Sequence, residues 1–102
     1  MADSFLTTVV TAETEVIDEH MVLSFTALCR ASGAARFQVQ AMVDEGLLQP
    51  TGTGPQSWQF SGAALGPARD TLRLARELGL SLHAAAIVRD LVQQIRALQA
   101  RR

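Results

Sequence analysis

The sequence contains no lysine and only one cysteine among its 102 residues. Cys29 cannot form an internal disulfide, and its place on the apolar side of a predicted helix indicates a small buried side chain rather than a reactive thiol. No apolar run approaches the roughly 20 residues that span a bilayer. The first ten residues, MADSFLTTVV, also lack a basic leader. We therefore expect a cytoplasmic protein with no membrane contact.

Groups that perform catalysis or bind metals are also scarce. His20 and His83 are the only histidines, and neither has a carboxylate or a cysteine at metal-ligand spacing. The sequence holds no Ser/His/acid arrangement, no glycine-rich phosphate loop and no CxxC pair. We therefore expect a protein that is not an enzyme and that uses no cofactor and no metal.

The residues that are present predict a mainly α-helical fold, with a helix-turn-helix and a wing between Ser24 and Phe60. The first helix, SFTALCRASG, begins at the capping residue Ser24 and ends at Gly33. The second helix runs from about residue 35 to 45, and Gly46 ends it because glycine adopts a positive φ without a Cβ clash. The predicted buried side chains are Phe25, Leu28, Cys29, either Phe37 or Val39, Met42 and Val43.

A glycine- and proline-rich segment, TGTGPQS at residues 51–57, predicts the tip of a β-hairpin. Trp58 and Phe60 alternate with Gln59, so both aromatic side chains lie on one face of a short strand, either in the core or at a contact. Pro67 suits the start of a further helix, which ends at Gly79. Its expected inward residues are Leu72, Ala75 and Leu78, and its expected outward residues are Arg69, Arg73 and Arg76.

A long C-terminal helix is predicted from Leu82 to about Gln99, capped by Ser81. From Ala84 onward its apolar residues are spaced by four, three, four and three positions, which is a heptad pattern. We interpret the later part of this row as the seam of a homodimer, and packing within one chain is the alternative. The seam residues are Val88, Leu91, Ile95 and Leu98.

The sequence predicts that the N-terminal residues 1–20 form an acidic arm. Residues 7–11 could form an edge strand, or the segment could be loose and partly disordered. The acids form either a solvated tail or an arm that contacts a basic partner. These acids are Glu13, Glu15, Asp18 and Glu19.

Charge is divided unevenly along the chain, although its net value is only −1. Residues 1–50 hold seven acids against Arg30 and Arg36, a net of −5, and residues 51–102 hold three acids against seven arginines, a net of +4. A DNA-binding protein concentrates positive charge on its helix-turn-helix, because neutralising phosphates supplies most non-specific affinity. The acidic helix-turn-helix half therefore argues against DNA as the partner.

The segments SFTALCRASG, GLLQP (46–50) and LARELGLSL (74–82) together resemble the MerR helix-turn-helix family. A finer similarity is to chaperone modulators of the CbpM type, a MerR-like group. It is carried by Asp44-Glu45 before Gly46, by the hairpin that leads into WQFSGAAL (58–65), and by the leucine-rich last helix. The resemblance implies a MerR-like winged helix-turn-helix at residues 21–80, followed by a C-terminal helix at residues 81–102.

CbpM-like proteins regulate DnaJ-type co-chaperones. The resemblance therefore implies binding to the J-domain of a DnaJ/CbpA-like partner, which would stop that J-domain from stimulating Hsp70. J-domains present a basic helix to Hsp70, so an acidic face is its electrostatic complement. We place the partner-binding face at Asp44 and Glu45, with the acidic arm (Glu13, Glu15, Asp18 and Glu19) and Trp58 beside it.

The alternative is a MerR-like DNA-binding transcriptional regulator. DNA-binding MerR proteins usually carry an Arg-Tyr-Tyr-type run in the second helix, where this sequence has Gln40, Ala41 and Met42. Their wing usually carries arginine near a tyrosine, where Trp58 and Phe60 stand here. Both differences remove phosphate-binding donors, so the sequence favours a protein partner.

Overall fold

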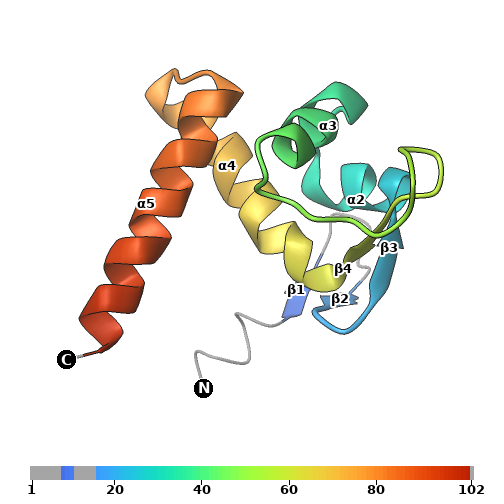
Figure 1. Cartoon of the computed structure of the whole chain (residues 1–102), viewed down its shortest axis with the longest axis horizontal. Helices are drawn as coiled ribbons and strands as arrows, with labels where there is room; N and C mark the ends of the chain where they lie inside the picture. Colours follow the sequence, from blue (N-terminus) through green and yellow to red (C-terminus); the bar gives the residue numbers. More distant parts are fainter. Residues whose placement is uncertain (1–7, 11–15, 102) are drawn as a thin grey trace.

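Two short helices, α2 (Phe25–Ser32) and α3 (Arg36–Asp44), form the helix-turn-helix, shown in Figure 1. The computed structural model describes residues 8–10 and 16–101 of the chain. Ser24 caps α2, because its hydroxyl accepts a hydrogen bond from the amide of Ala27 at 3.1 Å. Both helices lie within one residue of their predicted ends, so the helix-turn-helix is confirmed.

The turn between α3 and the wing depends on Gly46. Its φ of +79° lies in the left-handed region, where a side chain would be strained. The amide of Gly46 donates to the carbonyl of Val43, and the amide of Leu47 donates to the carbonyl of Met42 at 2.9 Å. These two bonds form a Schellman motif, which satisfies the last carbonyls of α3 and fixes the direction of the chain beyond Asp44.

The wing is built on strand β4 (Gln59–Ser61), which pairs antiparallel with β3 (Val22–Ser24) and places Leu23 opposite Phe60. Gln59 also forms an isolated β-bridge with Thr51, through two hydrogen bonds of 3.0 Å. The predicted hairpin is therefore present, but its strand begins at residue 59 rather than 58. The sequence did not predict that β4 also pairs with β3.

A second strand pair precedes the helix-turn-helix. Strand β1 (Thr8–Val10) pairs antiparallel with β2 (Val16–Asp18), within the region that the sequence presented as an acidic arm. Ile17 is only 2% exposed and joins the core, so β2 is packed against the domain rather than lying in a solvated tail. The sequence did not predict β2, because two apolar residues between acids are too short a signal.

Gly62 lets this strand pair approach the domain closely. It begins the short 3-10 helix η1 (Gly62–Ala64), and a Cβ at this position would lie 1.9 Å from the carbonyl oxygen of Asp18. The amide of Gly62 donates to the carbonyl of Met21 at 2.7 Å, and the hydroxyl of Ser61 donates to the carbonyl of Glu19 at 2.9 Å. These contacts hold the segment after β2 against η1.

We predict that Gly62→Ala displaces this segment from η1. A Cβ that meets a backbone oxygen cannot be accommodated by a side-chain rotation, so the free energy of unfolding should fall by about 1–3 kcal/mol. Urea unfolding followed by circular dichroism measures this loss. Gly54→Ala is the matched control, because a Cβ at Gly54 has no atom within 4 Å. Equal stability of the two variants would contradict the close approach.

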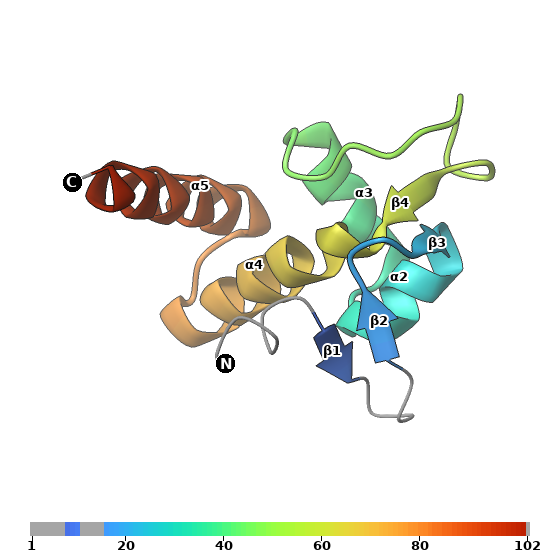
Figure 2. The same ribbon diagram turned by 90° about the horizontal axis from the view of Figure 1, so that it is seen from below.

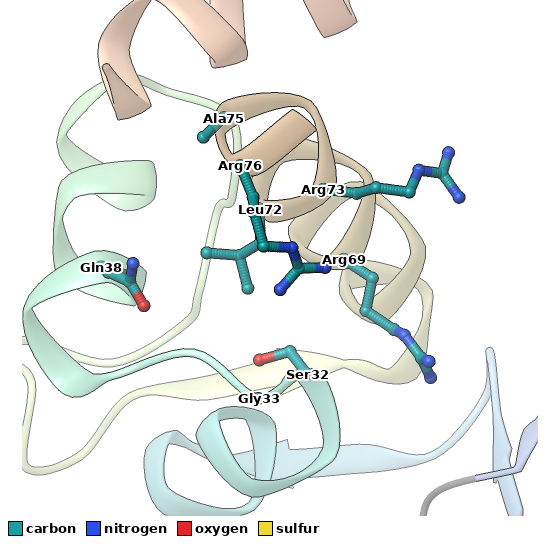
Figure 3. Close-up of a pocket in the computed structure, with 8 residues that line it drawn as sticks. All are labelled: Ser32, Gly33, Gln38, Arg69, Leu72, Arg73, Ala75 and Arg76. Carbon is teal, nitrogen blue, oxygen red and sulfur yellow. The ribbon is translucent and has the colours of Figure 1, made fainter. Parts of the chain in front are cut away.

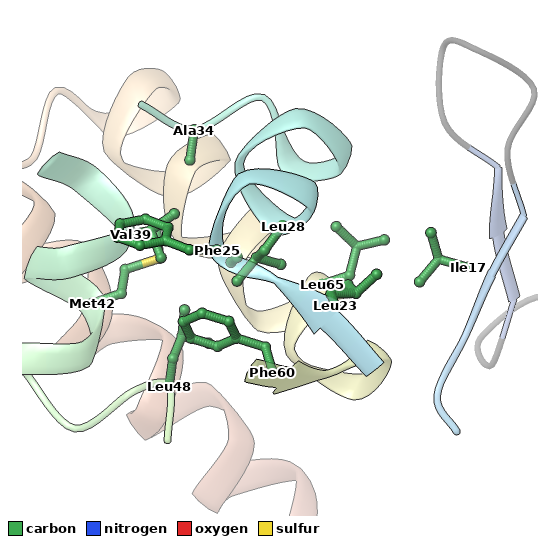
Figure 4. Packing of buried hydrophobic residues seen from close by; sticks show 11 residues of the cluster. Ile17, Leu23, Phe25, Leu28, Ala34, Val39, Met42, Leu48, Phe60 and Leu65 are labelled. Atoms are coloured by element: carbon green, nitrogen blue, oxygen red, sulfur yellow. The ribbon is translucent and has the colours of Figure 1, made fainter. Parts of the chain in front are cut away.

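The two remaining helices are α4 (Leu65–Leu78) and α5 (Leu82–Ala100). The apolar core extends along α4 only as far as Leu72. The prediction that Leu78 faces inward is therefore wrong: Leu78 is 59% exposed, and the inner face of α4 carries Thr71, whose hydroxyl donates to the carbonyl of Pro67 at 2.9 Å. The core residues drawn in Figure 4 include Ile17, Leu23, Phe25, Leu28, Val39, Met42, Phe60 and Leu65.

Helix α5 packs against α3 near its start and against α4 along its first half, where Arg89 lies 3.6 Å from Asp70. Ala85 and Ala86 are buried in that half, and Ser81 caps the helix by accepting from the amide of Ala84 at 3.1 Å. Figures 1 and 2 both show the C-terminal end of α5 far from α2 and from the strands. The mainly α-helical fold with a long C-terminal helix is therefore confirmed.

Candidate partner-binding site

The C-terminal end of α3 carries the two acids that the sequence selected. Asp44 is the last residue of the helix, and Glu45 follows as its C-cap. Both are exposed, because the Schellman motif turns the chain inward only at Leu47 and Leu48. Within the described residues Asp44 forms no ion pair, so its carboxylate is available to a partner.

Glu45 has a neighbour from a distant part of the sequence. Its Oε1 lies 2.6 Å from Nδ1 of His83, in the first turn of α5. The contact links the end of α3 to the start of α5, and it uses one of the two carboxylate oxygens. His83 is thus a surface residue whose imidazole orients the Glu45 carboxylate.

A hollow of about 260 Å³ lies between the end of α3 and the start of α5. Acidic side chains stand at this hollow beside aliphatic ones, because Glu45 and Asp90 line it together with Ile87 and Leu91. A basic helix with one apolar side matches this combination of charges and aliphatic surface. The lining residues are Glu45, Gly46, Leu47, Ala86, Ile87, Asp90 and Leu91.

The structure separates the predicted acids into two groups. Asp18 and Glu19 are exposed at the end of β2, and Figure 4 places Ile17 of that strand at the opposite end of the core from Met42 of α3. Asp18 also accepts from the amide of His20 at 2.6 Å, which forms a local turn. Glu13 and Glu15 lie outside the described residues. The structure therefore does not bring Asp18 and Glu19 next to Asp44 and Glu45.

Trp58 belongs to an aromatic cluster. Its ring centroid lies 5.5 Å from that of Phe25 and 6.0 Å from that of Phe60, the latter pair in an edge-on arrangement. Arg36 stacks on the Phe25 ring at 4.4 Å. Trp58 is half-buried, so its indole contributes to the core while part of its surface reaches solvent.

The outer face of α3 offers little to a nucleic acid. Phe37 is 73% exposed, so the alternative in which Phe37 is buried is wrong, and Val39 occupies the core instead. Gln40 and Asp44 are exposed on the same helix, whereas Arg36 is held against Phe25 and donates to the Thr26 hydroxyl at 3.4 Å. The helix that would enter a DNA groove thus ends in negative charge.

The described residues contain no cluster of three or more histidine, cysteine, aspartate or glutamate side chains that could hold a metal ion. Burial raises the pKa of the Cys29 thiol, and the nearby Arg36 charge opposes this only in part, so the thiol stays protonated near neutral pH. None of the helices described is both long and apolar enough to span a bilayer.

Comparison with known proteins agrees with this architecture. A family described as MerR HTH family regulatory protein matches residues 7–102. The chain belongs to the MerR helix-turn-helix family. The match includes the last helix as well as the helix-turn-helix and the wing, so the MerR-like resemblance seen in the sequence is confirmed.

Among curated proteins, the chain is similar to several that are named chaperone modulatory protein CbpM. The one from Coxiella burnetii is 29% identical over 86 residues, which cover 84% of this chain and 81% of that protein. One from Pseudomonas putida is 29% identical over 77 residues, which cover 76% of each chain. One from Pseudomonas entomophila is 25% identical over 77 residues, again 76% of each. The CbpM-like resemblance is therefore also confirmed.

Proposed function

We propose that the protein is a non-enzymatic, cytoplasmic chaperone modulator that binds the J-domain of a DnaJ/CbpA-like co-chaperone and inhibits its stimulation of Hsp70. Three kinds of relatives that match most of the chain carry the name chaperone modulatory protein. The acidic end of α3, beside an aliphatic hollow, is the observation that carries the proposal. Inhibition follows from occupying the J-domain surface and needs no chemistry in the modulator.

The hollow between α3 and α5 supports binding of a basic helix. Asp44 and Glu45 stand at the end of α3, and Asp90 adds a third carboxylate from α5. Ile87 and Leu91 provide an aliphatic surface on which the stems of lysine or arginine side chains can lie. Complementary charge raises the association rate and selects the orientation of the partner, while the apolar contact contributes affinity.

The direct test is calorimetric titration of the full chain with the isolated J-domain of a DnaJ-like protein from the same organism. We expect saturable binding that weakens as salt is added, because surface charges are screened over about 8 Å at physiological ionic strength. The ATPase activity of Hsp70, stimulated by the full co-chaperone, should fall as the modulator is added. Absence of binding would exclude this function, and binding without a fall in ATPase activity would exclude inhibition.

We also propose a homodimer formed through α5. The helix holds 19 residues, so it is about 28 Å long at 1.5 Å per residue. Of the predicted seam residues, Ile95 and Leu98 are 53% and 61% exposed and do not line the hollow beside Glu45. Leu91, at 51%, also lines that hollow, so the two surfaces meet at this residue. Val88 is half-buried, so it lies at the margin of the seam. Such a row of large aliphatic side chains is characteristic of an interface.

A second candidate function is DNA binding, which the MerR family match favours. The arginines of α4 are available to contact a phosphate backbone. In α3, however, Arg36 is the one cationic residue that the structure describes, so this helix offers little to a DNA groove. A gel-shift assay with genomic fragments tests this function. Sequence-preferring, salt-sensitive binding together with no affinity for a J-domain would support DNA binding over the modulator.

A further inference from the structure

A second hollow lies away from the acidic end of α3. It has a volume of about 520 Å³ and lies between the C-terminal end of α2, the first half of α3 and the outer side of α4 (Figure 3). We call it the arginine hollow, because three of its eight lining residues are arginines. The lining residues are Ser32, Gly33, Gln38, Arg69, Leu72, Arg73, Ala75 and Arg76.

The arginines gather here because of their spacing on α4. Residues 69, 73 and 76 are separated by four and three positions, so they share one side of the helix. All three are exposed. Arg73 lies 3.5 Å from Asp70, and Figure 3 shows its side chain pointing away from Gln38. Across the described chain, Arg69 and Arg76 form no ion pair, so their charge is not neutralised internally.

Besides its positive charge, the arginine hollow has an apolar wall and a hydrogen-bond donor, which a ligand must also match. Leu72 points from α4 toward Gln38 of α3, and Ala75 lies beside it, so the wall includes apolar surface (Figure 3). Gln38 accepts from the amide of Ala35 at 2.9 Å through its Oε1, which leaves its amino group as a donor. The hollow therefore offers guanidinium groups and an amide donor to acceptor oxygens, next to an aliphatic contact.

We propose that the arginine hollow is a second docking surface, which binds an acidic segment of a partner protein. Aspartate or glutamate side chains would accept hydrogen bonds from Arg69 and Arg76, and an apolar side chain of the segment would contact Leu72. Guanidinium groups suit carboxylates because their planar donors match the two oxygens. This site is distinct from the J-domain face, since it has the opposite charge and is formed by the other end of α3.

An acidic protein segment fits better than a nucleic-acid backbone. A DNA duplex presents a convex, densely charged phosphate backbone, whereas this surface is concave and includes the apolar side chains of Leu72 and Ala75. A duplex laid over α4 would also need cations from α3, and the exposed residues of that helix include Phe37, Gln40 and Asp44. The combination of cations and aliphatic surface therefore points to a peptide with both acidic and apolar side chains.

The test uses the full chain and a fluorescein-labelled peptide of glutamate, leucine and alanine, followed by fluorescence anisotropy. We expect saturable, salt-sensitive binding that the double variant Arg69→Gln/Arg76→Gln weakens roughly tenfold, since each loses a charge-assisted hydrogen bond. The matched control is Arg96→Gln/Arg101→Gln, which removes the same charge from an exposed position on α5 and from its C-cap. The control should change affinity by less than about twofold.

Three outcomes would overturn the proposal. They are a wild-type chain that shows no saturable binding, an equal loss in both double variants, and a random-sequence DNA duplex that displaces the peptide at a lower concentration than unlabelled peptide does. The same variants titrated with the J-domain separate the two surfaces. Arg69→Gln/Arg76→Gln should keep its affinity for the J-domain, which also shows that the variant is folded.

Discussion

Replacing both Asp44 and Glu45 with lysine should weaken J-domain binding by roughly 10- to 100-fold and flatten its dependence on salt. The change converts the exposed end of α3 from two negative charges to two positive ones, which then face a basic helix. Repulsion lowers the association rate, and loss of the ion pairs raises the dissociation rate. Calorimetry at low and physiological salt measures both the affinity and its salt dependence.

The contact between Glu45 and His83 requires a separate control. Lysine at position 45 also removes the 2.6 Å contact with the imidazole, so a loss of binding could reflect a displaced α5. His83→Ala breaks that contact but keeps both carboxylates, and it should change the affinity by less than about twofold, as expected for an exposed pair. If His83→Ala weakens binding as much as the double lysine variant, the position of α5 matters rather than the charge of α3.

The helix-turn-helix could be predicted from the sequence because its boundaries are encoded locally. Ser24 caps α2 through a hydrogen bond three residues away, and Gly33 and Gly46 adopt the positive φ values that end the two helices. The capping residue Ser81 defines the start of α5 in the same way. Such signals require no knowledge of the tertiary structure.

Features that depend on tertiary contacts were missed or predicted wrongly. Leu78 has the helical spacing of an inward-facing residue, but the apolar core extends along α4 only to Leu72. The spacing therefore predicted burial for a residue that is exposed. Ile17 is buried because Gly62 admits the backbone of β2, a contact between residues far apart in the sequence. A short strand of this kind has no periodic signal that could reveal it.

The candidate sites likewise combine residues that the sequence could identify with neighbours that only the tertiary structure brings together. Asp44 and Glu45 could be found as adjacent acids at a predicted helix end, but nothing in the sequence shows that Asp90 and Ile87 stand beside them. The three arginines of α4 were predicted to face outward, and the structure adds that they do so beside the end of α2, where a hollow forms. The uneven charge along the sequence thus becomes two surfaces of opposite sign.

The second prediction with a large expected effect concerns dimerisation through α5. Ile95→Glu/Leu98→Glu should convert a dimer into a monomer at micromolar concentration, because burying each of these side chains contributes up to about 1.5–3 kcal/mol and buried glutamates would be unpaired. Sedimentation velocity measures the state of association. The matched control is Ala97→Glu/Ala100→Glu, which adds two negative charges to exposed positions on the opposite side of the same helix and should remain a dimer.

A wild-type chain that sediments as a monomer at micromolar concentration would exclude this seam. The folded domain should survive in the monomeric variant, because Ile95 and Leu98 are exposed and lie beyond Gln93, the last half-buried residue of α5. Its helical circular dichroism should therefore match that of the control. The hollow beside Glu45 uses Ile87 and Leu91, at the other end of the row. The monomer should consequently still bind a J-domain, which separates self-association from partner binding.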